Sequence, residues 1–105
     1  MNLINNRRPS TKKNGGSFTD AEIQAVWEKG QTIYGLDSDL WRKDSCGAKI
    51  YRHSYGSTTS QGWEIDHIIP VSKGGSDDLS NLQPLQWENN RHKSDNISWS
   101  CKVTG

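Results

Sequence analysis

The sequence predicts a small single domain of the α+β class, with an N-terminal helix and a C-terminal strand–loop–strand–helix unit. Capping residues followed by apolar residues at helical spacing occur near residue 20, and two short apolar runs flank a glycine-containing turn near residue 74. A chain of 105 residues is short enough that one domain is the simplest expectation. Because hydrophobic residues make up only 30% of it, we expect a loop-rich fold organised around aromatic residues, with large apolar surfaces supplied by five tryptophans.

The first 18 residues differ in charge from the rest of the chain. They contain Arg7, Arg8, Lys12 and Lys13 but no acidic residue, whereas all twelve Asp and Glu residues follow. Asparagine, serine and glycine dominate this segment, so we predict a basic flexible arm at 1–18 and a folded domain at 19–105. A disordered terminus with incidental charge explains the same composition. The net charge of +1 is low for a protein that binds nucleic acid.

A helix is predicted over about residues 20–29. Thr19 and Glu22 have the spacing of a capping box, and Gly30 is a residue type that ends helices. Three apolar residues fall on one face, which we expect to lie in the core: Ile23, Val26 and Trp27. After an irregular stretch, residues 48–52 are predicted to form a short strand, and residues 53–62 a surface loop.

The C-terminal half carries the clearest order of elements. Residues 63–69 alternate and include β-branched side chains, so they predict a strand that Pro70 ends. Residues 73–78 contain glycines suited to a turn, and residues 79–85 return as a second short strand. Good helix formers from 86 to about 94 predict a short polar helix.

Asp66 and His67 are the most informative pair of residues. Neighbours in a strand point to opposite faces, so the two side chains are expected to have different roles. A carboxylate is a hard ligand suited to Mg²⁺, and a neutral imidazole suits proton abstraction near neutral pH. If the last helix packs across the strands, Asn90 can complete an oxygen-only metal site. The pair therefore indicates metal-assisted hydrolysis, against the alternative of a turn-capping Asp and an ordinary buried His.

Three segments carry a resemblance to a known family: Asp66–Gly75, Asn81–Leu85 and Asn90–Lys93. Their residue types and spacing resemble the HNH endonuclease family over about residues 63–95. The resemblance implies a ββα-metal fold and the hydrolysis of phosphodiester bonds in DNA with one divalent cation.

The same resemblance implies a role for each matching residue. His67 matches the general base, and Asp66 matches the metal-binding carboxylate. Asn81 matches the middle asparagine, which braces the loop and helps to orient the imidazole. Asn90 matches the second metal ligand, which is His in many members. This HNN variant is similar to the HNH domain of the CRISPR effector nuclease. An amide oxygen favours Mg²⁺ or Mn²⁺ over Zn²⁺, and we expect Mg²⁺.

A second departure from the family concerns structural zinc. Many members carry two Cys-x-x-Cys pairs, but the downstream positions here are Gln86 and Asn89, and only Cys46 remains upstream. A tetrahedral site needs four nitrogen or sulfur ligands, so we expect no structural zinc. In its place we expect packing by three aromatic residues, Trp41, Trp63 and Trp87.

Other charged residues near the motif are weaker candidates. Lys93, at i+3 from Asn90, and its neighbour Arg91 are candidate contacts to a substrate phosphate. Glu64 shares the strand face of the metal-binding carboxylate, where it can act on the metal through water. His92 lies two residues beyond Asn90 and is expected at the surface or on DNA, not as a metal ligand. A solvated surface side chain is the ordinary alternative for each of these residues.

DNA is the expected partner, in its double-stranded form first, and RNA and a homodimer are left open. We expect weak specificity because a short chain offers little surface for reading bases. No apolar stretch approaches the roughly 20 residues that span a bilayer, and the first residues lack the apolar segment of a signal peptide. We therefore expect a cytoplasmic protein with no membrane partner. Cys46 and Cys101 are expected as reduced thiols, with a bridge between them left open.

Two other functions are kept as alternatives. The chain can be a nucleic-acid-binding module that has the same shape without turnover, although intact Asp66, His67, Asn81 and Asn90 argue against this. It can also be a nuclease toxin domain released from a larger secreted protein, which a neighbouring immunity partner would support.

Overall fold

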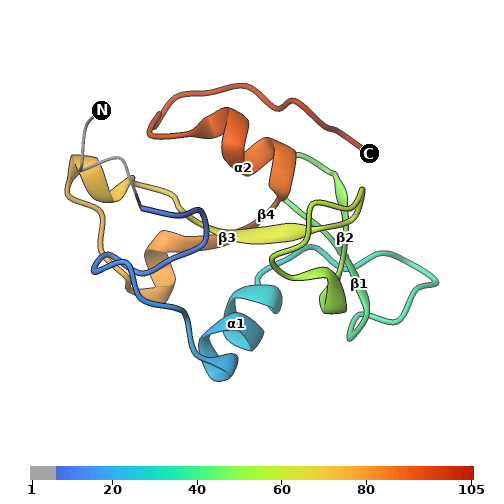
Figure 1. The fold of residues 1–105 in the computed structure, drawn as a ribbon. Coiled ribbons are helices and arrows are strands. Elements are labelled where there is room, and N and C mark those ends of the chain that lie inside the picture. Colours follow the sequence, from blue (N-terminus) through green and yellow to red (C-terminus); the bar gives the residue numbers. More distant parts are fainter. Residues whose placement is uncertain (1–6) are drawn as a thin grey trace.

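The computed structural model describes residues 7–105, which form two helices and two small antiparallel sheets (Figure 1). In chain order the elements are α1 (Asp20–Trp27), β1 (Trp41–Lys43), β2 (Lys49–Tyr51), β3 (Trp63–His67), β4 (Leu82–Gln86) and α2 (Trp87–Lys93). Short 3-10 turns lie in the connections: η2 (Arg52–Ser54), η3 (Val71–Lys73) and η4 (Leu79–Asn81). The predicted α+β class is confirmed. Within the described residues, neither helix has the length and apolarity needed to cross a membrane.

Helix α1 begins as the sequence predicts. The Thr19 hydroxyl accepts the N–H of Glu22 at 3.2 Å, and the Glu22 carboxylate accepts the N–H of Thr19 at 2.9 Å. This reciprocal capping box satisfies two of the donors left free at a helix start. The helix ends at Trp27, two residues earlier than expected, because the N–H of Gly30 turns back to the Trp27 carbonyl.

Strands β1 and β2 form a hairpin in which Arg42 lies opposite Ile50. The sequence predicts β2 but not β1. Strand β1 is only three residues long and half-buried throughout, so it shows no alternation between apolar and polar residues. Its Trp41 ring packs against Tyr51 across the hairpin, with ring centroids 4.7 Å apart.

Strands β3 and β4 form the second hairpin, and α2 follows β4 directly. The predicted order of strand, loop, strand and helix is confirmed, although β3 ends at His67 and β4 begins only at Leu82, after η4. All five side chains of β3 are buried. This is because α2 packs on one face of the hairpin and α1 lies on the other (Figure 1).

The core is built on two tryptophans from different parts of the chain. The rings of Trp27 and Trp63 are fully buried, with centroids 5.2 Å apart. The indole N–H of Trp27 donates to the carbonyl of Ser38, and that of Trp63 donates to the carbonyl of Arg52. Burial therefore leaves neither donor unpaired. The rest of the cluster consists of Phe18, Ile23, Val26, Ile50, Ile65 and Leu82. The expectation of a core organised around aromatic residues is confirmed.

The described part of the N-terminal segment, residues 7–18, contacts β3 and the loop that follows it. The hydroxyl of Ser10 accepts the N–H of Ile65 at 2.8 Å, on the edge of β3 away from β4, and bonds the Tyr55 hydroxyl at 2.7 Å. Farther along, the N–H of Lys13 donates to the carboxylate of Asp77. The first six residues of the predicted arm lie outside the described residues, and the flexibility of the arm stays a prediction.

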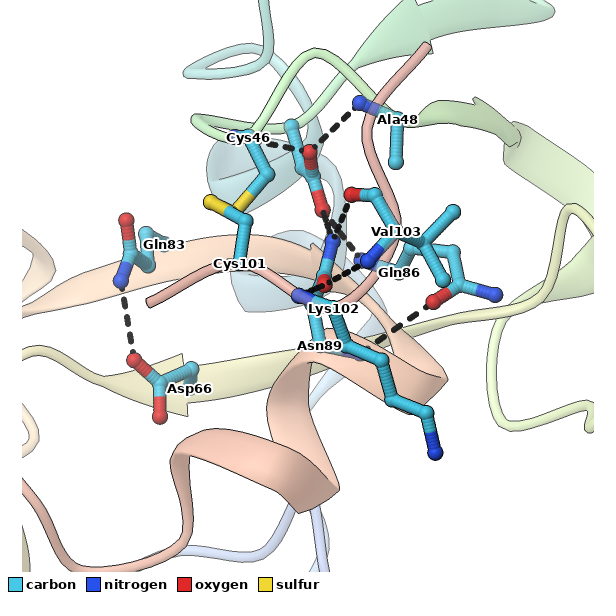
Figure 2. The surroundings of a disulfide bond; sticks show 10 residues. Cys46, Ala48, Asp66, Gln83, Gln86, Asn89, Cys101, Lys102 and Val103 are labelled. Atoms are coloured by element: carbon cyan, nitrogen blue, oxygen red, sulfur yellow. Dashed lines mark hydrogen bonds between the residues drawn. A yellow bond between two sulfur atoms is a disulfide. The ribbon is translucent and has the colours of Figure 1, made fainter. Parts of the chain in front are cut away.

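Cys46 and Cys101 form a disulfide, so the expectation of reduced thiols is wrong and the bridge left open is the one found. It joins the β1–β2 turn to the C-terminal segment (Figure 2). The same segment is held by Asn89 of α2. Its side-chain amide donates to the carbonyl of Val103 at 2.8 Å and accepts the N–H groups of Lys102 and Val103 at 2.9 and 2.7 Å (Figure 2).

A buried carboxylate connects this region to α2. Asp44 is only 2% exposed, and its Oδ1 accepts the N–H groups of Cys46 and Ala48, both at 2.9 Å. Its Oδ2 accepts the N–H of Gln86 at 2.9 Å and the side-chain amide of Asn89 at 3.0 Å. Four donors satisfy the carboxylate, which allows a buried charge to be tolerated.

The structure corrects the expectation that three tryptophans pack together in place of a structural zinc site. Gln86 and Asn89, the two positions that the resemblance aligns with a Cys-x-x-Cys pair, both bond Asp44. The predicted packing unit of Trp41, Trp63 and Trp87 does not form. Trp63 is in the core with Trp27, whereas Trp41 and Trp87 are half-buried and contact other residues.

Candidate active site

A pocket of about 280 Å³ lies where the end of β3, the middle of α2 and the N-terminal segment meet. Asp66 and His67 line it from β3, Asn90 and Arg91 line it from α2, and residues 7–10 form another part of its wall. The fold therefore brings together the two predicted metal ligands and the predicted base, which come from separate elements.

The carboxylate of Asp66 points towards α2. Its Oδ2 accepts the side-chain N–H of Gln83, the residue opposite it on β4, at 3.0 Å, and its Oδ1 lies 3.1 Å from the Lys93 ammonium (Figure 2 shows the Gln83 contact). Burial raises the pKa of Asp66, and the Gln83 hydrogen bond and the Lys93 charge oppose the rise. Each carboxylate oxygen has two lone-pair sites, so both can accept a further ligand.

Lys93 is fully buried under the site, with 1% of the residue exposed. Its ammonium donates to the carbonyl of His67 at 2.9 Å and pairs with Asp66. In this position it balances the charge of Asp66. A contact to a substrate phosphate stays a prediction, and the burial of Lys93 leaves its ammonium little access to solvent.

His67 points away from Asp66, towards the loop between β3 and β4, as neighbours on a strand do. Its Nε2 lies 2.8 Å from Oδ1 of Asp77. The ring centroid of Phe18 lies 6.2 Å from the imidazole centroid. His67 is 6% exposed and lines the pocket.

Asn81 ties the two sides of the β3–β4 loop together. Its side-chain N–H groups donate to the carbonyls of Ile69 and Ser76 at 3.1 and 2.9 Å, and its oxygen accepts the N–H of Ile69 at 2.9 Å. The loop is tight at Gly75, where a Cβ would lie 1.7 Å from the Ile69 carbonyl oxygen. The amide of Asn81 therefore shapes the loop, and the side chain that the imidazole contacts through a hydrogen bond is that of Asp77.

Asn90 is oriented by Glu64, which is buried on the same face of β3 as Asp66. The side-chain N–H of Asn90 donates to Oε1 of Glu64 at 2.9 Å, and the Arg91 guanidinium donates to Oε2 at 2.9 Å. The Glu64 hydrogen bond raises the pKa of Arg91. Within residues 7–105 no hydrogen bond involves the amide oxygen of Asn90, and the residue lines the pocket.

These side chains form a donor set that fits a hard divalent cation. Asp66 offers a carboxylate and Asn90 offers an amide oxygen, which are ligand types that Mg²⁺ accepts. In the described chain, no group of three or more His, Cys, Asp or Glu side chains is arranged to hold a metal ion. A cation here would take few ligands from the protein, which leaves coordination positions for water and a phosphate.

Asp77 is the site residue that the sequence interpretation missed. In the sequence it is one residue of the turn predicted at 73–78. Its contact with His67 spans ten residues and depends on the loop shape that Gly75 and Asn81 impose. The signal available in the sequence was an acidic residue in the loop that follows the Asp-His pair.

Comparison with known families agrees with this geometry. A family model described as HNH endonuclease matches residues 44–96, slightly more than half of the chain. The match includes both β3 and β4, the loop between them and all of α2. No curated protein and no solved structure matches the chain. HNH domains are generally nucleases that act on nucleic acids and usually bind a divalent metal. The chain belongs to the HNH endonuclease family.

Proposed function

We propose that this protein is a metal-dependent endonuclease that hydrolyses phosphodiester bonds of DNA with one divalent cation, Mg²⁺ by preference and Mn²⁺ as a substitute. The observation that carries the proposal is the pocket that joins Asp66, His67 and Asn90. A nucleic-acid-binding module without turnover would not need a carboxylate, an imidazole and an amide oxygen on one small pocket.

Each residue has one task in the proposed reaction. The imidazole of His67 takes a proton from the attacking water. Asp66 and Asn90 would hold the cation, which supplies positive charge near the phosphate and the leaving 3′-oxygen when it is bound. Glu64 fixes the orientation of Asn90 through the 2.9 Å hydrogen bond. Lys93 places an ammonium 3.1 Å from the carboxylate of Asp66, which favours its ionised form and opposes the effect of burial.

The substrate contacts are proposed for the basic groups on the pocket wall. Arg91 is half-exposed and lies over the Trp87 ring, while Arg7 and Arg8 line the pocket from the N-terminal segment. A DNA strand that enters the pocket would meet positive charge from both elements. The small size of this surface supports weak sequence specificity, and a homodimer would be one way to extend it.

The disulfide favours a second candidate, a nuclease toxin domain. Disulfides persist in oxidising compartments and are rare in a reducing cytosol, and a toxin nuclease passes through such compartments. A cytoplasmic location stays a prediction, and it requires the protein to remain folded when Cys46 and Cys101 are thiols. Both candidates use the same pocket for the same reaction.

Metal dependence is the first test of the proposed function. Supercoiled plasmid should be nicked or linearised in Mg²⁺ and in Mn²⁺, should stay intact in EDTA, and should be cut again when Mg²⁺ is added in excess. The Asn90→Ala variant should need a higher Mg²⁺ concentration for the same rate because one protein ligand is lost. Cleavage that persists in EDTA, or no cleavage with any divalent cation by folded protein, would contradict the proposal.

A further inference from the structure

The carboxylate of Asp77 is the hydrogen-bond partner of the proposed base. Asp77 Oδ1 and His67 Nε2 are 2.8 Å apart, and the His67 side chain is nearly buried while that of Asp77 is one-third exposed. An ionised carboxylate can only accept a hydrogen bond, so the proton of this contact belongs to Nε2. Among residues 7–105 this contact at Nε2 is the only hydrogen bond of the imidazole, and His67 lines the pocket.

Asp77 is itself held in place by the N-terminal segment. The backbone N–H of Lys13 donates to both of its oxygens, at 3.0 and 3.2 Å. Burial pushes the pKa of Asp77 upward, but the hydrogen bonds from His67 and Lys13 and the nearby charges outweigh it, so the pKa is lowered overall. Asp77 is therefore a carboxylate at neutral pH. Loop geometry maintained by Asn81 and Gly75 keeps it opposite His67.

We propose that Asp77 is a positioning residue that keeps the proton of the neutral His67 imidazole on Nε2 and leaves Nδ1 free to act on the pocket side. The inference rests on the proposed function, in which His67 is the base. One O–H bond of water breaks as the proton moves to Nδ1, and the water oxygen forms its bond to phosphorus while the bond to the 3′-oxygen breaks. The leaving oxygen takes a proton from solvent. Asp77 still accepts from Nε2–H and balances the positive charge of the imidazolium.

The neighbouring Asp78 provides a matched control. It lies in the same loop and carries the same charge, but it is exposed, and its side chain makes no hydrogen bond to the helical turn that it precedes. If Asp77 served only to keep negative charge in the loop, the Asp77→Ala and Asp78→Ala variants would behave alike.

The tautomer of His67 can be measured directly by ¹⁵N NMR of the imidazole nitrogens. The chain has only three histidines, and the signals lost in His67→Ala assign His67. In the wild type and in Asp78→Ala, we expect the neutral ring to show a protonated Nε2 and an unprotonated Nδ1. In Asp77→Ala, both nitrogens should shift towards the averaged values of a mixed tautomer. Asp77→Asn should restore the wild-type pattern, since its amide oxygen can still accept from Nε2–H.

Kinetics provide the second readout. Asp77→Ala should lower the single-turnover rate of DNA cleavage on the order of 10- to 100-fold, with DNA affinity unchanged, and Asp77→Asn should recover part of the rate. Asp78→Ala should cut at the wild-type rate. An equal loss of rate in both alanine variants, or a loss of DNA affinity that accounts for the whole effect in Asp77→Ala, would overturn the proposal.

The two readouts separate this inference from the proposed function. A proton on Nδ1 in the wild type, or an unchanged tautomer in Asp77→Ala, would overturn the positioning role even if the protein cuts DNA. The expected tautomer change in a protein that cuts no DNA would support the positioning of the imidazole and contradict the nuclease function. If Asp77→Ala fails to fold, a mixed tautomer in the wild type or in folded Asp77→Asn would still overturn the inference.

Discussion

Replacing His67 by alanine is expected to slow DNA cleavage by a factor on the order of 10² to 10⁴, because the attacking water then has no positioned base. The fold should persist. The imidazole contributes a hydrogen bond to the partly exposed Asp77, whose carboxylate can be solvated when the ring is absent. The initial rate at which supercoiled plasmid is lost in Mg²⁺ measures the effect, and circular dichroism checks the fold.

His53 supplies the control for this prediction. It is an exposed histidine in η2 that does not line the pocket, so His53→Ala should cut at the wild-type rate. DNA binding by His67→Ala should equal that of the wild type, since the phosphate contacts proposed for Arg7, Arg8 and Arg91 remain. A folded His67→Ala preparation, free of other nucleases, that cuts at the wild-type rate would show that His67 is not the base.

Reducing the Cys46–Cys101 disulfide is expected to lower the free energy of unfolding by about 4 kcal/mol, by the loop-entropy relation for a closure of this length. The two cysteines are 55 residues apart, so the bridge greatly restricts the unfolded chain. Reduction also frees the C-terminal segment, which Asn89 holds through the backbone of Lys102 and Val103. Urea unfolding followed by tryptophan fluorescence, with and without a reductant, measures the change.

The variant with both cysteines replaced by serine is the control for reduction. It should unfold at the midpoint of the reduced wild type and should not respond to the reductant. Equal midpoints for the oxidised and reduced wild type would contradict the predicted stabilisation. The same result would remove the objection to a cytoplasmic location, because the protein would then be stable in a reducing compartment.

The features predictable from the sequence depend on residues close together in the chain. The capping box of Thr19 and Glu22 spans one helical turn, and the start of α1 that it predicts is correct. The order of β3, loop, β4 and α2 follows from alternation, glycine and helix formers within about 30 residues. Residue types at the spacing of the family motif predicted Asp66, His67 and Asn90 as site residues, and all three line one pocket in the fold.

The features missed by the sequence interpretation depend on contacts between distant residues. In the sequence, Asp44 resembles any polar turn residue. Its carboxylate bonds Gln86 of β4 and Asn89 of α2, which are close to it only in the folded chain. The distance between Cys46 and Cys101 in the chain gave no reason to pair them. The partner of His67 could not be predicted because the side chain of Asp77 reaches it only after the loop has closed.

Asp66 and His67 act as a unit in the proposed reaction, and the most direct measurement of this is a double-variant cycle. Single-turnover cleavage of a labelled DNA duplex in Mg²⁺ would be followed for the wild type, Asp66→Ala, His67→Ala and the double variant. Each single variant should be strongly impaired, and the double variant should be little slower than the slower of the two, because either loss already disables the site. A single variant that keeps the wild-type rate, or losses that multiply in the double variant, would contradict one metal-dependent site built from both residues.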